Sequence, residues 1–420
     1  MTRTLLSAPP TERVGRYPKH AFQTREIPFE IVPFMIAPVL PGETINNLHF
    51  ESRVISDPIK NPIIGWKKEY YFFYVRITDL LNDAIRDMFV DPANTDLTAT
   101  LGIAANSQVY YTAKGGIDYA QRCLQRVTET YFRDKGEAWN ATVSSNGLPM
   151  AHVRDIYWMD SLTDKDVMPE GATIAGATDM GDLDRLYDAF EQLRALGLNQ
   201  MTYEDFLRSY GIAIPEKDQN KPELLARFSD FQYPSNTVDP STGIPVSAVS
   251  WVFRNDKRDP KFFKEPGFVF GVSLTRPKLY FGGVAGSMAA HMGRAWDWMP
   301  NYLWQMPETA LKPFAADTGP LGDQTTATDG YFADMRDLLL YGDQWQNIVA
   351  FNPAPVNVGA QHIIALPTAN NHQAKKVTDA MVKEFFTTPA SAFYIRQDGY
   401  CSLSIKGRMV DYTQGTMATM

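Results

Sequence analysis

Pro33-Phe-Met-Ile-Ala-Pro-Val-Leu-Pro-Gly-Glu-Thr44 is the stretch of sequence that constrains the fold of this chain most strongly. It holds three prolines and one glycine within twelve residues. This density forbids a helix, because proline lacks the backbone N–H and fixes φ. We therefore expect an extended segment that ends in a turn at Pro41-Gly42.

Two strands are predicted directly after this turn. In the first, one face of the strand is expected to be buried and the other solvated, because side chains of two kinds alternate. The inward face comprises Leu48, Phe50, Ser52 and Val54, and the outward face comprises His49, Glu51 and Arg53. The second strand, Trp66-Lys-Lys-Glu-Tyr-Tyr-Phe-Phe-Tyr-Val-Arg-Ile77, is rich in aromatic residues and is expected to be buried on both faces or packed under another sheet. Between them, Asp57-Pro-Ile-Lys-Asn-Pro62 predicts a turn.

The order of these elements, with these residues, resembles the N-terminal part of the major capsid protein of the Microviridae, the small tailless phages with single-stranded DNA. Val39-Leu-Pro-Gly-Glu-Thr44 and Tyr71-Phe-Phe-Tyr-Val75 carry the resemblance. Thr202-Tyr-Glu-Asp-Phe-Leu-Arg-Ser-Tyr-Gly211, followed by Lys221-Pro-Glu-Leu-Leu225, is similar to a helix and downstream segment of that family. Gly267-Phe-Val-Phe-Gly-Val-Ser-Leu-Thr-Arg-Pro277 is similar to a late barrel strand.

The resemblance implies a mainly β fold, an eight-stranded antiparallel jelly-roll barrel with large, partly helical insertions between strands. It implies a structural protein, not an enzyme, that self-assembles into a T=1 icosahedral shell around a circular single-stranded DNA genome. Insertion loops would form the surface and symmetry-axis contacts. The implied partners are further copies of the chain, the DNA, the phage's small basic DNA-binding, scaffolding and pilot proteins, and a host-surface receptor. The implied location is the virion capsid, assembled in the bacterial cytoplasm, with no cofactor and no membrane insertion.

The strand and helix signals divide the chain into a discontinuous core and two insertions. The ranges are a basic N-terminal arm at 1–30, jelly-roll core at 31–78, 241–281 and 341–420, a large partly helical insertion at 79–240, and a Trp/Met-rich insertion at 282–340. Apolar residues at helical spacing predict helices at Asp79–Val90, Ile117–Phe132, Asp182–Leu196 and Lys375–Phe386, with a further helix start at Thr202. Later strands are predicted at Ile244–Phe253, Phe268–Leu274, Trp345–Asn352, Gln361–Leu366, Ala392–Arg396 and Tyr400–Ile405.

The net charge of −8 argues against a protein that coats nucleic acid over its whole surface. Basic residues nevertheless gather at the N-terminus, where residues 1–25 contain five cations and a single acidic residue, Glu12. These candidate DNA-facing residues are Arg3, Arg13, Arg16, Lys19 and Arg25. One interpretation is an inward-facing tail near packaged DNA, and the other is a frayed terminus with ordinary solvated charges.

A second basic segment, Phe253-Arg-Asn-Asp-Lys-Arg-Asp-Pro-Lys-Phe-Phe-Lys264, alternates cations with aromatic rings. Cations follow a phosphate backbone, and rings stack on unpaired bases. Its candidate DNA-facing residues are Arg254, Lys257, Arg258 and Lys261. The alternative is a solvated turn between two strands, with its phenylalanines pointing into the core.

The Trp/Met-rich segment at 287–306 offers candidate contacts with other subunits or with a receptor. These candidates are Trp296, Trp298, Trp304, Met292 and Met299. Tryptophan and methionine are enriched at the centres of interfaces. The same residues would equally close a hydrophobic mini-core beneath a long loop.

Catalytic and metal-binding spacings are absent from the sequence, with no phosphate-binding glycine loop, His-Glu-x-x-His or Gly-x-Ser-x-Gly motif. Cys123 and Cys401 are the two cysteines, so a disulfide framework is not expected. The N-terminus lacks the apolar core of a signal peptide. The alternative to the capsid hypothesis is a carbohydrate-binding or carbohydrate-active β-sandwich protein, in which exposed Trp and Tyr would stack on sugars.

Overall fold

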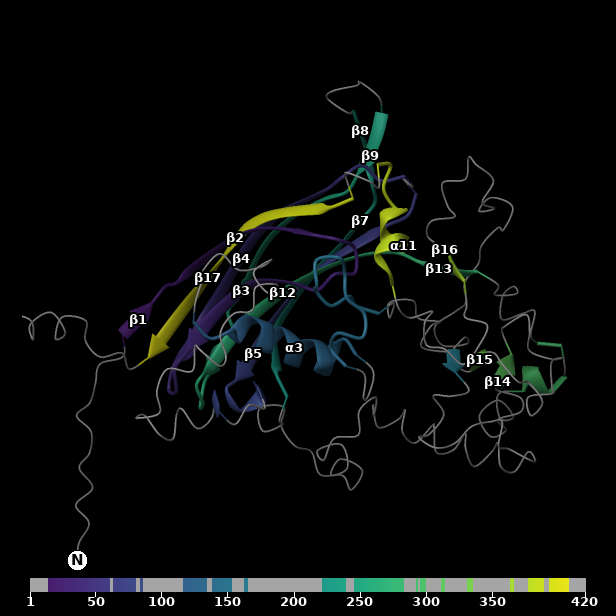
Figure 1. Cartoon of the computed structure of the whole chain (residues 1–420). Helices are drawn as coiled ribbons and strands as arrows, with labels where there is room; N and C mark the ends of the chain where they lie inside the picture. Colours follow the sequence, from purple (N-terminus) through teal and green to yellow (C-terminus); the bar gives the residue numbers. More distant parts are fainter. Residues whose placement is uncertain are drawn as a thin grey trace, which may run out of the picture.

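The structure of the chain is a computed structural model that is mainly β, with few helices among the described residues (Figure 1). It describes residues 14–60, 63–80, 84–85, 116–133, 138–152, 221–238, 245–282, 292–293, 295–299, 377–388 and 393–407, and the short strands at 162–164, 311–313, 331–334 and 363–365.

The larger sheet, sheet A, has the strand order β1-β17-β4-β10, while β2 also pairs with β17 and β11 with β4. Its strands are β1 (Val14–Arg16), β2 (Lys19–Glu26), β4 (Thr44–Ser56), β10 (Ser250–Lys257), β11 (Lys261–Phe262) and β17 (Ile395–Gly407). Every pair in this sheet is antiparallel.

The second large sheet, sheet B, has the order β3-β12-β5-β7 and is also antiparallel. Its strands are β3 (Val32–Val39), β12 (Gly267–Pro277), β5 (Trp66–Arg76) and β7 (Glu223–Gln232). Side chains from the two sheets meet between them, where the ring of Phe50 in β4 lies 4.5 Å from that of Tyr70 in β5. The hydroxyl of Tyr70 also lies 2.8 Å from the Oγ of Ser52. The two sheets therefore face each other across one core.

The alternation predicted for the first strand is confirmed in β4. Leu48, Phe50, Ser52 and Val54 are buried between the sheets. The outward residues His49, Glu51 and Arg53 remain partly or fully exposed. The predicted turn before this strand is present at Gly42, whose φ of 86° lies in the region that glycine adopts without steric strain.

Strand β5 is buried on both faces, as its aromatic composition predicts. Trp66, Tyr70 and Phe72 contribute to the core between the sheets. Phe73 and Val75 point the other way, into a second core that the helix α3 (Tyr119–Tyr131) helps to cover. Figure 1 shows α3 on the side of sheet B away from sheet A. The outer face of sheet B is thus an interior surface.

Helix α3 confirms the helix predicted at Ile117–Phe132, and Asp118 caps it by accepting a hydrogen bond from the Gln121 backbone N–H. The helix predicted at Lys375–Phe386 is shorter, α11 (Asp379–Lys383). Of the range 79–90, the structure describes a 3-10 turn, η1 (Thr78–Leu80), and helical residues 84–85. The helix predictions at 182–196 and at Thr202, and the strand prediction at 345–352, lie outside the described residues.

The prediction of two final strands at Ala392–Arg396 and Tyr400–Ile405 is wrong, because β17 runs unbroken from Ile395 to Gly407. Asp398-Gly399 is typical of a hairpin turn, yet Gly399 here pairs with Ser52 inside the sheet. A Cβ at Gly399 would lie 2.3 Å from the Glu51 carbonyl oxygen and 2.8 Å from the Phe22 ring. The glycine serves close packing and not chain reversal.

The core ranges also differ from those predicted. Strand β7 completes sheet B although it lies within the range 79–240 expected as an insertion. Ala226 is its one fully buried residue, so this edge strand carries no alternating apolar signal. In the range 341–420, β17 belongs to sheet A, whereas β16 (Ile363–Ala365) pairs in parallel with β13 (Tyr280–Gly282). The predicted strand at 244–253 is two strands, β9 (Pro245–Ala248) and β10.

Smaller elements lie outside the two large sheets. Strand β9 forms a hairpin with β8 (Ser235–Val238), which projects from one end of the sheets in Figure 1. A three-stranded sheet has the order β14-β15-β6, with β14 (Leu311–Pro313), β15 (Tyr331–Asp334) and β6 (Leu162–Asp164). The 3-10 turn η5 (Ala295–Trp298) lies in the Trp/Met-rich segment.

The N-terminal arm expected at 1–30 is ordered structure from residue 14 onward. Strands β1 and β2 both pair with β17, and Phe22, Ile27 and Phe29 are buried in the core. Phe22 is the one apolar residue on the inward side of β2, where it alternates with His20, Thr24 and Glu26, so the segment carries no apolar period that would indicate a strand. Residues 14–26 therefore belong to sheet A and are not a free tail.

Glu30 attaches the segment 138–152 to the sheets. Its carboxylate accepts hydrogen bonds from the Ile27 backbone N–H, at 3.0 Å, and from the Ser144 hydroxyl. The Asn146 side-chain amide donates a further bond, at 3.0 Å. Burial raises the pKa of Glu30 to about 7, against the opposing effect of these bonds, and the charge of Glu26 raises it further. Burial outweighs these bonds, so the folded protein favours the protonated form of Glu30, although the bonds themselves are stronger to the carboxylate.

The replacement Phe22→Ala tests whether β2 is part of the fold. The Phe22 ring lies 4.8 Å from Phe34 and 6.0 Å from Phe50, so we expect the free energy of unfolding to fall by about 3 kcal/mol in urea titrations. Gln23→Ala, at the exposed neighbouring position, is the control and should change it by less than about 0.5 kcal/mol. Equal stability of the two variants would contradict the placement of β2.

The replacement Glu30→Gln tests the buried carboxyl. The folded protein holds this proton with a pKa of about 7 and the unfolded chain with its ordinary value of 4.5. Stability from Glu30 is therefore complete below pH 4.5 and is lost as the pH rises to about 7. Relative to the wild type, the variant should gain about 3 kcal/mol in free energy of unfolding between these pH values. A difference that stays constant with pH would contradict this account.

Candidate functional site

Three of the basic residues predicted to face DNA come together on the outward face of sheet A. Lys19 and Arg25 lie on β2, and Arg254 lies on β10 at the opposite edge. All three side chains are exposed. The register places Lys19 opposite Ser402 and Arg25 opposite Arg396 of β17, while Arg254 lies opposite Glu51 of β4. Two basic segments distant in sequence thus share one surface.

A network of polar side chains crosses the middle of this face. The Nδ1 of His49 lies 2.6 Å from Asp256 Oδ1, and its Nε2 lies 3.2 Å from the Tyr400 hydroxyl. The hydrogen bond from His49 lowers the pKa of Asp256 below its usual value. The side chains of His49 and Asp256 keep 24% and 41% of their exposure, so the network is open to solvent. It can present hydrogen-bonding groups and a ring to a partner.

Sequence reasoning did not select three of the residues on this face, Arg53, Tyr400 and Lys406. The alternation in β4 already placed Arg53 on the outward side. Tyr400 and Lys406 had no local signal, because their membership of the face depends on the pairing of β17 with β4.

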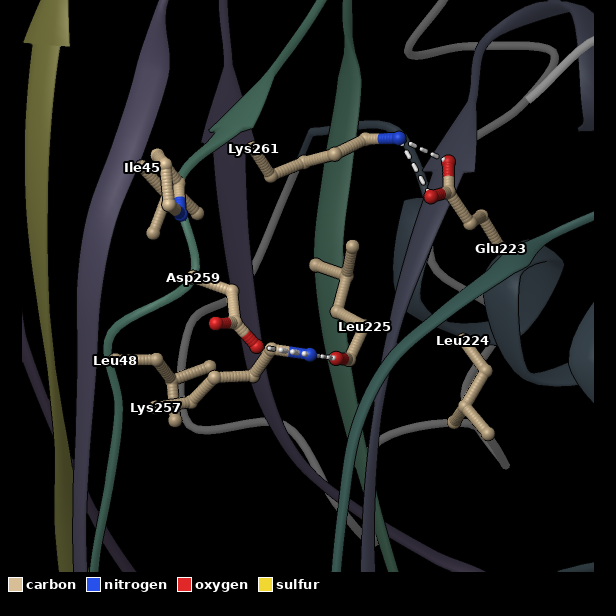
Figure 2. A pocket seen from close by; sticks show the side chains of 9 residues that line it. Ile45, Leu48, Glu223, Leu224, Leu225, Lys257, Asp259 and Lys261 are labelled. Carbon is tan, nitrogen blue, oxygen red and sulfur yellow. Dashed lines mark hydrogen bonds and ion pairs between the residues drawn. The ribbon is translucent and has the colours of Figure 1, made fainter. Parts of the chain in front are cut away.

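Lys257 and Lys261, also predicted to face DNA, are engaged at the edge between the two sheets. Figure 2 shows the Lys261 ammonium pointing at both carboxylate oxygens of Glu223 on β7. The Lys257 ammonium donates to the Leu225 carbonyl oxygen and lies 3.7 Å from Asp259 Oδ2. Both lysines therefore connect sheet A to β7 of sheet B.

A small pocket lies between these contacts, lined by Ile45 and Leu48 of β4 and by β7 residues such as Leu224 (Figure 2). Its volume is about 130 Å³. Pockets for small molecules usually measure about 300–1,000 Å³. This pocket is too small for such a ligand, and its charged groups already bind one another.

The remaining basic candidates lie in different surroundings. The Arg16 guanidinium donates two hydrogen bonds to the Glu43 carboxylate, at 2.9 Å and 2.7 Å, next to the turn before β4. Arg258 is exposed and lies 4.0 Å from Asp256. Arg3 and Arg13 lie outside the described residues. In the segment 253–264, Phe253 and Phe263 point into the core, whereas Phe262 is half exposed.

The Trp/Met-rich segment is described in part. Trp298 is 69% exposed and its indole N–H donates to the Met292 carbonyl oxygen at 3.3 Å. Met299 is 44% exposed, whereas Met292 packs against the main core. Trp304 and the side chain of Trp296 are outside the described residues. The exposed pair Trp298 and Met299 is available for contact with another molecule.

A cluster of polar side chains in the described part of the chain is buried between the two sheets. Lys68 and Glu26 form an ion pair of 2.6 Å with both side chains fully buried. The Ser273 hydroxyl and the Gln397 amide donate to the same carboxylate, at 2.8 Å and 3.3 Å. Because no member of this pair meets solvent, the cluster is a structural feature of the fold.

A second buried carboxylate, Glu69, lies on the outer face of sheet B. Burial acts to raise its pKa, but the guanidiniums of Arg276 and Arg227 outweigh this effect and lower the pKa to about 2. Glu69 is therefore charged at every ordinary pH and anchors both arginines.

Within the described ranges, no group of three or more His, Cys, Asp and Glu side chains is placed to hold a metal ion. The same part of the chain contains no helix with the length and apolar character needed to cross a bilayer. Cys123 and Cys401 are buried free thiols, and burial raises the pKa of Cys401 to about 12. Both thiols are poor nucleophiles in this state.

Comparisons with known proteins add no further evidence of identity. No protein-family model matches the sequence, and no curated protein matches it. Any assignment of function therefore depends on the residues and on the geometry described above.

Proposed function

We propose that this chain is the shell-forming protein of a virus of the Microviridae type, built on an eight-stranded jelly roll. The order in which its strands pair carries the proposal. Taken in chain order, the eight long strands of the two sheets are β2, β3, β4, β5, β7, β10, β12 and β17. The first pairs with the eighth, the second with the seventh, the third with the sixth and the fourth with the fifth.

This pairing is the one produced when a long antiparallel hairpin is wrapped into two facing sheets. It supports the proposed jelly-roll topology, which recurs in viral capsid proteins and in lectins. The capsid reading is supported further by the residues of the Pro-Gly turn and of β5, which resemble those of the Microviridae major capsid protein. Fold alone does not fix function, so we base the choice of the capsid class on the sequence resemblance.

The long connections of the fold suit a protein that makes many contacts with its neighbours. Residues 77–222 separate β5 from β7, and residues 278–394 separate β12 from β17. In a closed shell, each subunit meets its neighbours through heterologous contacts that close around symmetry axes. Individual contacts of about 1,600 Å² can be weak, because each subunit makes several of them. We assign subunit and receptor contacts to these two connections.

The alternative, a carbohydrate-binding β-sandwich, needs aromatic side chains aligned on a sheet face. Among the described residues, the exposed Trp298 lies in the 3-10 turn η5, which is not part of either large sheet. The outward face of sheet A carries Tyr400 among charged side chains. This distribution favours the capsid proposal over sugar stacking.

The assembly state of the purified protein tests the proposal. We expect closed, uniform shells in negative-stain electron microscopy, or oligomers that sediment far faster than a 47.3 kDa monomer, when the chain is produced together with the other proteins of its own genome. The replacement Trp298→Ser should reduce assembly without lowering the melting temperature, because this side chain is exposed in the monomer. A dispersed monomer under every one of these conditions would contradict the proposal.

A further inference from the structure

The two large sheets differ in what covers their outer faces. On the outer face of sheet B, strands β5 and β12 are buried beneath α3 and a second apolar core, whereas the edge strand β7 is largely exposed. The outward face of sheet A carries exposed or half-exposed side chains on β2, β17, β4 and β10. In Figure 1, no labelled helix lies against this side of sheet A.

The charge of this face is opposite to that of the whole chain. Six cations and three acids point outward from its strands. The cations are Lys19, Arg25, Arg53, Arg254, Arg396 and Lys406, and the acids are Glu51, Asp256 and Asp398. Six minus three gives +3 for the face, on a chain whose net charge is −8. Such a concentration of positive charge indicates an anionic partner.

Three of the six cations have no charged or aromatic partner among the described residues. Arg254 is paired with Glu51, at 3.0 Å, Arg396 is paired with Asp57, at 2.6 Å, and the Arg25 guanidinium lies 4.6 Å from the centre of the Tyr394 ring. Lys19, Arg53 and Lys406 form no ion pair with any other described residue, although Arg53 lies opposite Asp398 in the register.

Small side chains and two rings give the face its shape. Tyr400 and His49 lie at its centre with their rings 5.7 Å apart. In the register, Ala21 lies opposite Tyr400, and Ser402 lies between Lys19 and His49. The strand β17, with 13 residues at about 3.3 Å each, extends over roughly 40 Å.

We infer that the outward face of sheet A binds the backbone of single-stranded DNA, and that it is the surface turned toward the genome. This inference deepens the proposed function and rests on it. Cations spaced along the strands of this face neutralise successive phosphates, while the rings of His49 and Tyr400 stack on unpaired bases. A surface that combines cations with rings suits a single strand, whose bases can splay, better than a duplex.

Binding of a fluorescein-labelled oligothymidylate of about 20 nucleotides to the purified full-length chain tests the inference by fluorescence anisotropy. The informative variant combines Lys19→Gln, Arg53→Gln and Lys406→Gln. Each phosphate contact contributes about 0.7 to the slope of log affinity against log salt for single strands, so losing three should flatten this slope by about 2. The affinity at about 0.1 M salt should fall on the order of 100-fold.

The matched control combines Lys60→Gln, Lys264→Gln and Lys383→Gln, which changes the net charge equally at positions outside the strands of this face. We expect the control to bind with nearly wild-type affinity and slope. Equal losses in both triple variants would overturn the inference, and so would an unchanged affinity in the first. Face-dependent binding to phosphatidylserine vesicles with none to the oligothymidylate would also overturn it.

The readout of assembly separates this inference from the proposed function. Shells of the first variant that form normally but carry less DNA, measured by the ratio of absorbance at about 260 and 280 nm, support both. Normal shells with normal DNA content overturn the inference alone. Failure of the wild-type chain to assemble overturns the proposed function, whatever the oligothymidylate result.

Discussion

The buried ion pair between Glu26 and Lys68 is the constraint on which the arrangement of the two sheets depends. Glu26 ends β2 of sheet A, and Lys68 lies on β5 of sheet B, with both side chains excluded from solvent. Such a pair contributes little net stability over an apolar pair, but loss of one partner would strand a buried charge at a penalty of about 3–5 kcal/mol. Hydrogen bonds from Ser273 on β12 and Gln397 on β17 add two more strands to the same carboxylate. This polar cluster thus connects β2 and β17 of sheet A with β5 and β12 of sheet B.

Among the described strands, those of sheet A present the larger polar face to other molecules. Strands β5 and β12 of sheet B are buried on both sides, since Phe73 and Val75 support α3, whereas the edge strand β7 is largely exposed. Sheet A is buried on one side, and its outward side gathers cations from β2, β4, β10 and β17. The edge between the sheets is closed by Lys261 with Glu223 and by Lys257 with the Leu225 carbonyl. This division leaves a polar surface on sheet A and long connections beyond both sheets, which is the arrangement that a shell protein around nucleic acid requires.

Local pattern in the sequence predicted those elements whose burial repeats with a regular period. The alternation from Leu48 to Val54, the aromatic strand β5 and the apolar stripe of α3 were all confirmed. Edge strand β7 has one buried residue and therefore no period to detect. Asp398-Gly399 resembled a turn in the sequence. The glycine is in fact required because Glu51 and Phe22, on other strands, leave no room for a Cβ at this position, and the local sequence does not show that contact. The outward face of sheet A could not be assembled from sequence for the same reason: Lys19, Arg53 and Lys406 come to share one face, at different points along β17, through long-range pairing alone.

The central claim is that this β sandwich builds a closed shell with the outward face of sheet A turned toward the enclosed DNA. A cryo-electron-microscopy reconstruction of the assembled particle tests it most directly. The account predicts that Arg53, Tyr400 and Lys406 line the interior, next to density for nucleic acid, and that the connections at 77–222 and 278–394 make the contacts between subunits. A particle with this face on its outer surface, or with the face buried between subunits, would contradict the account.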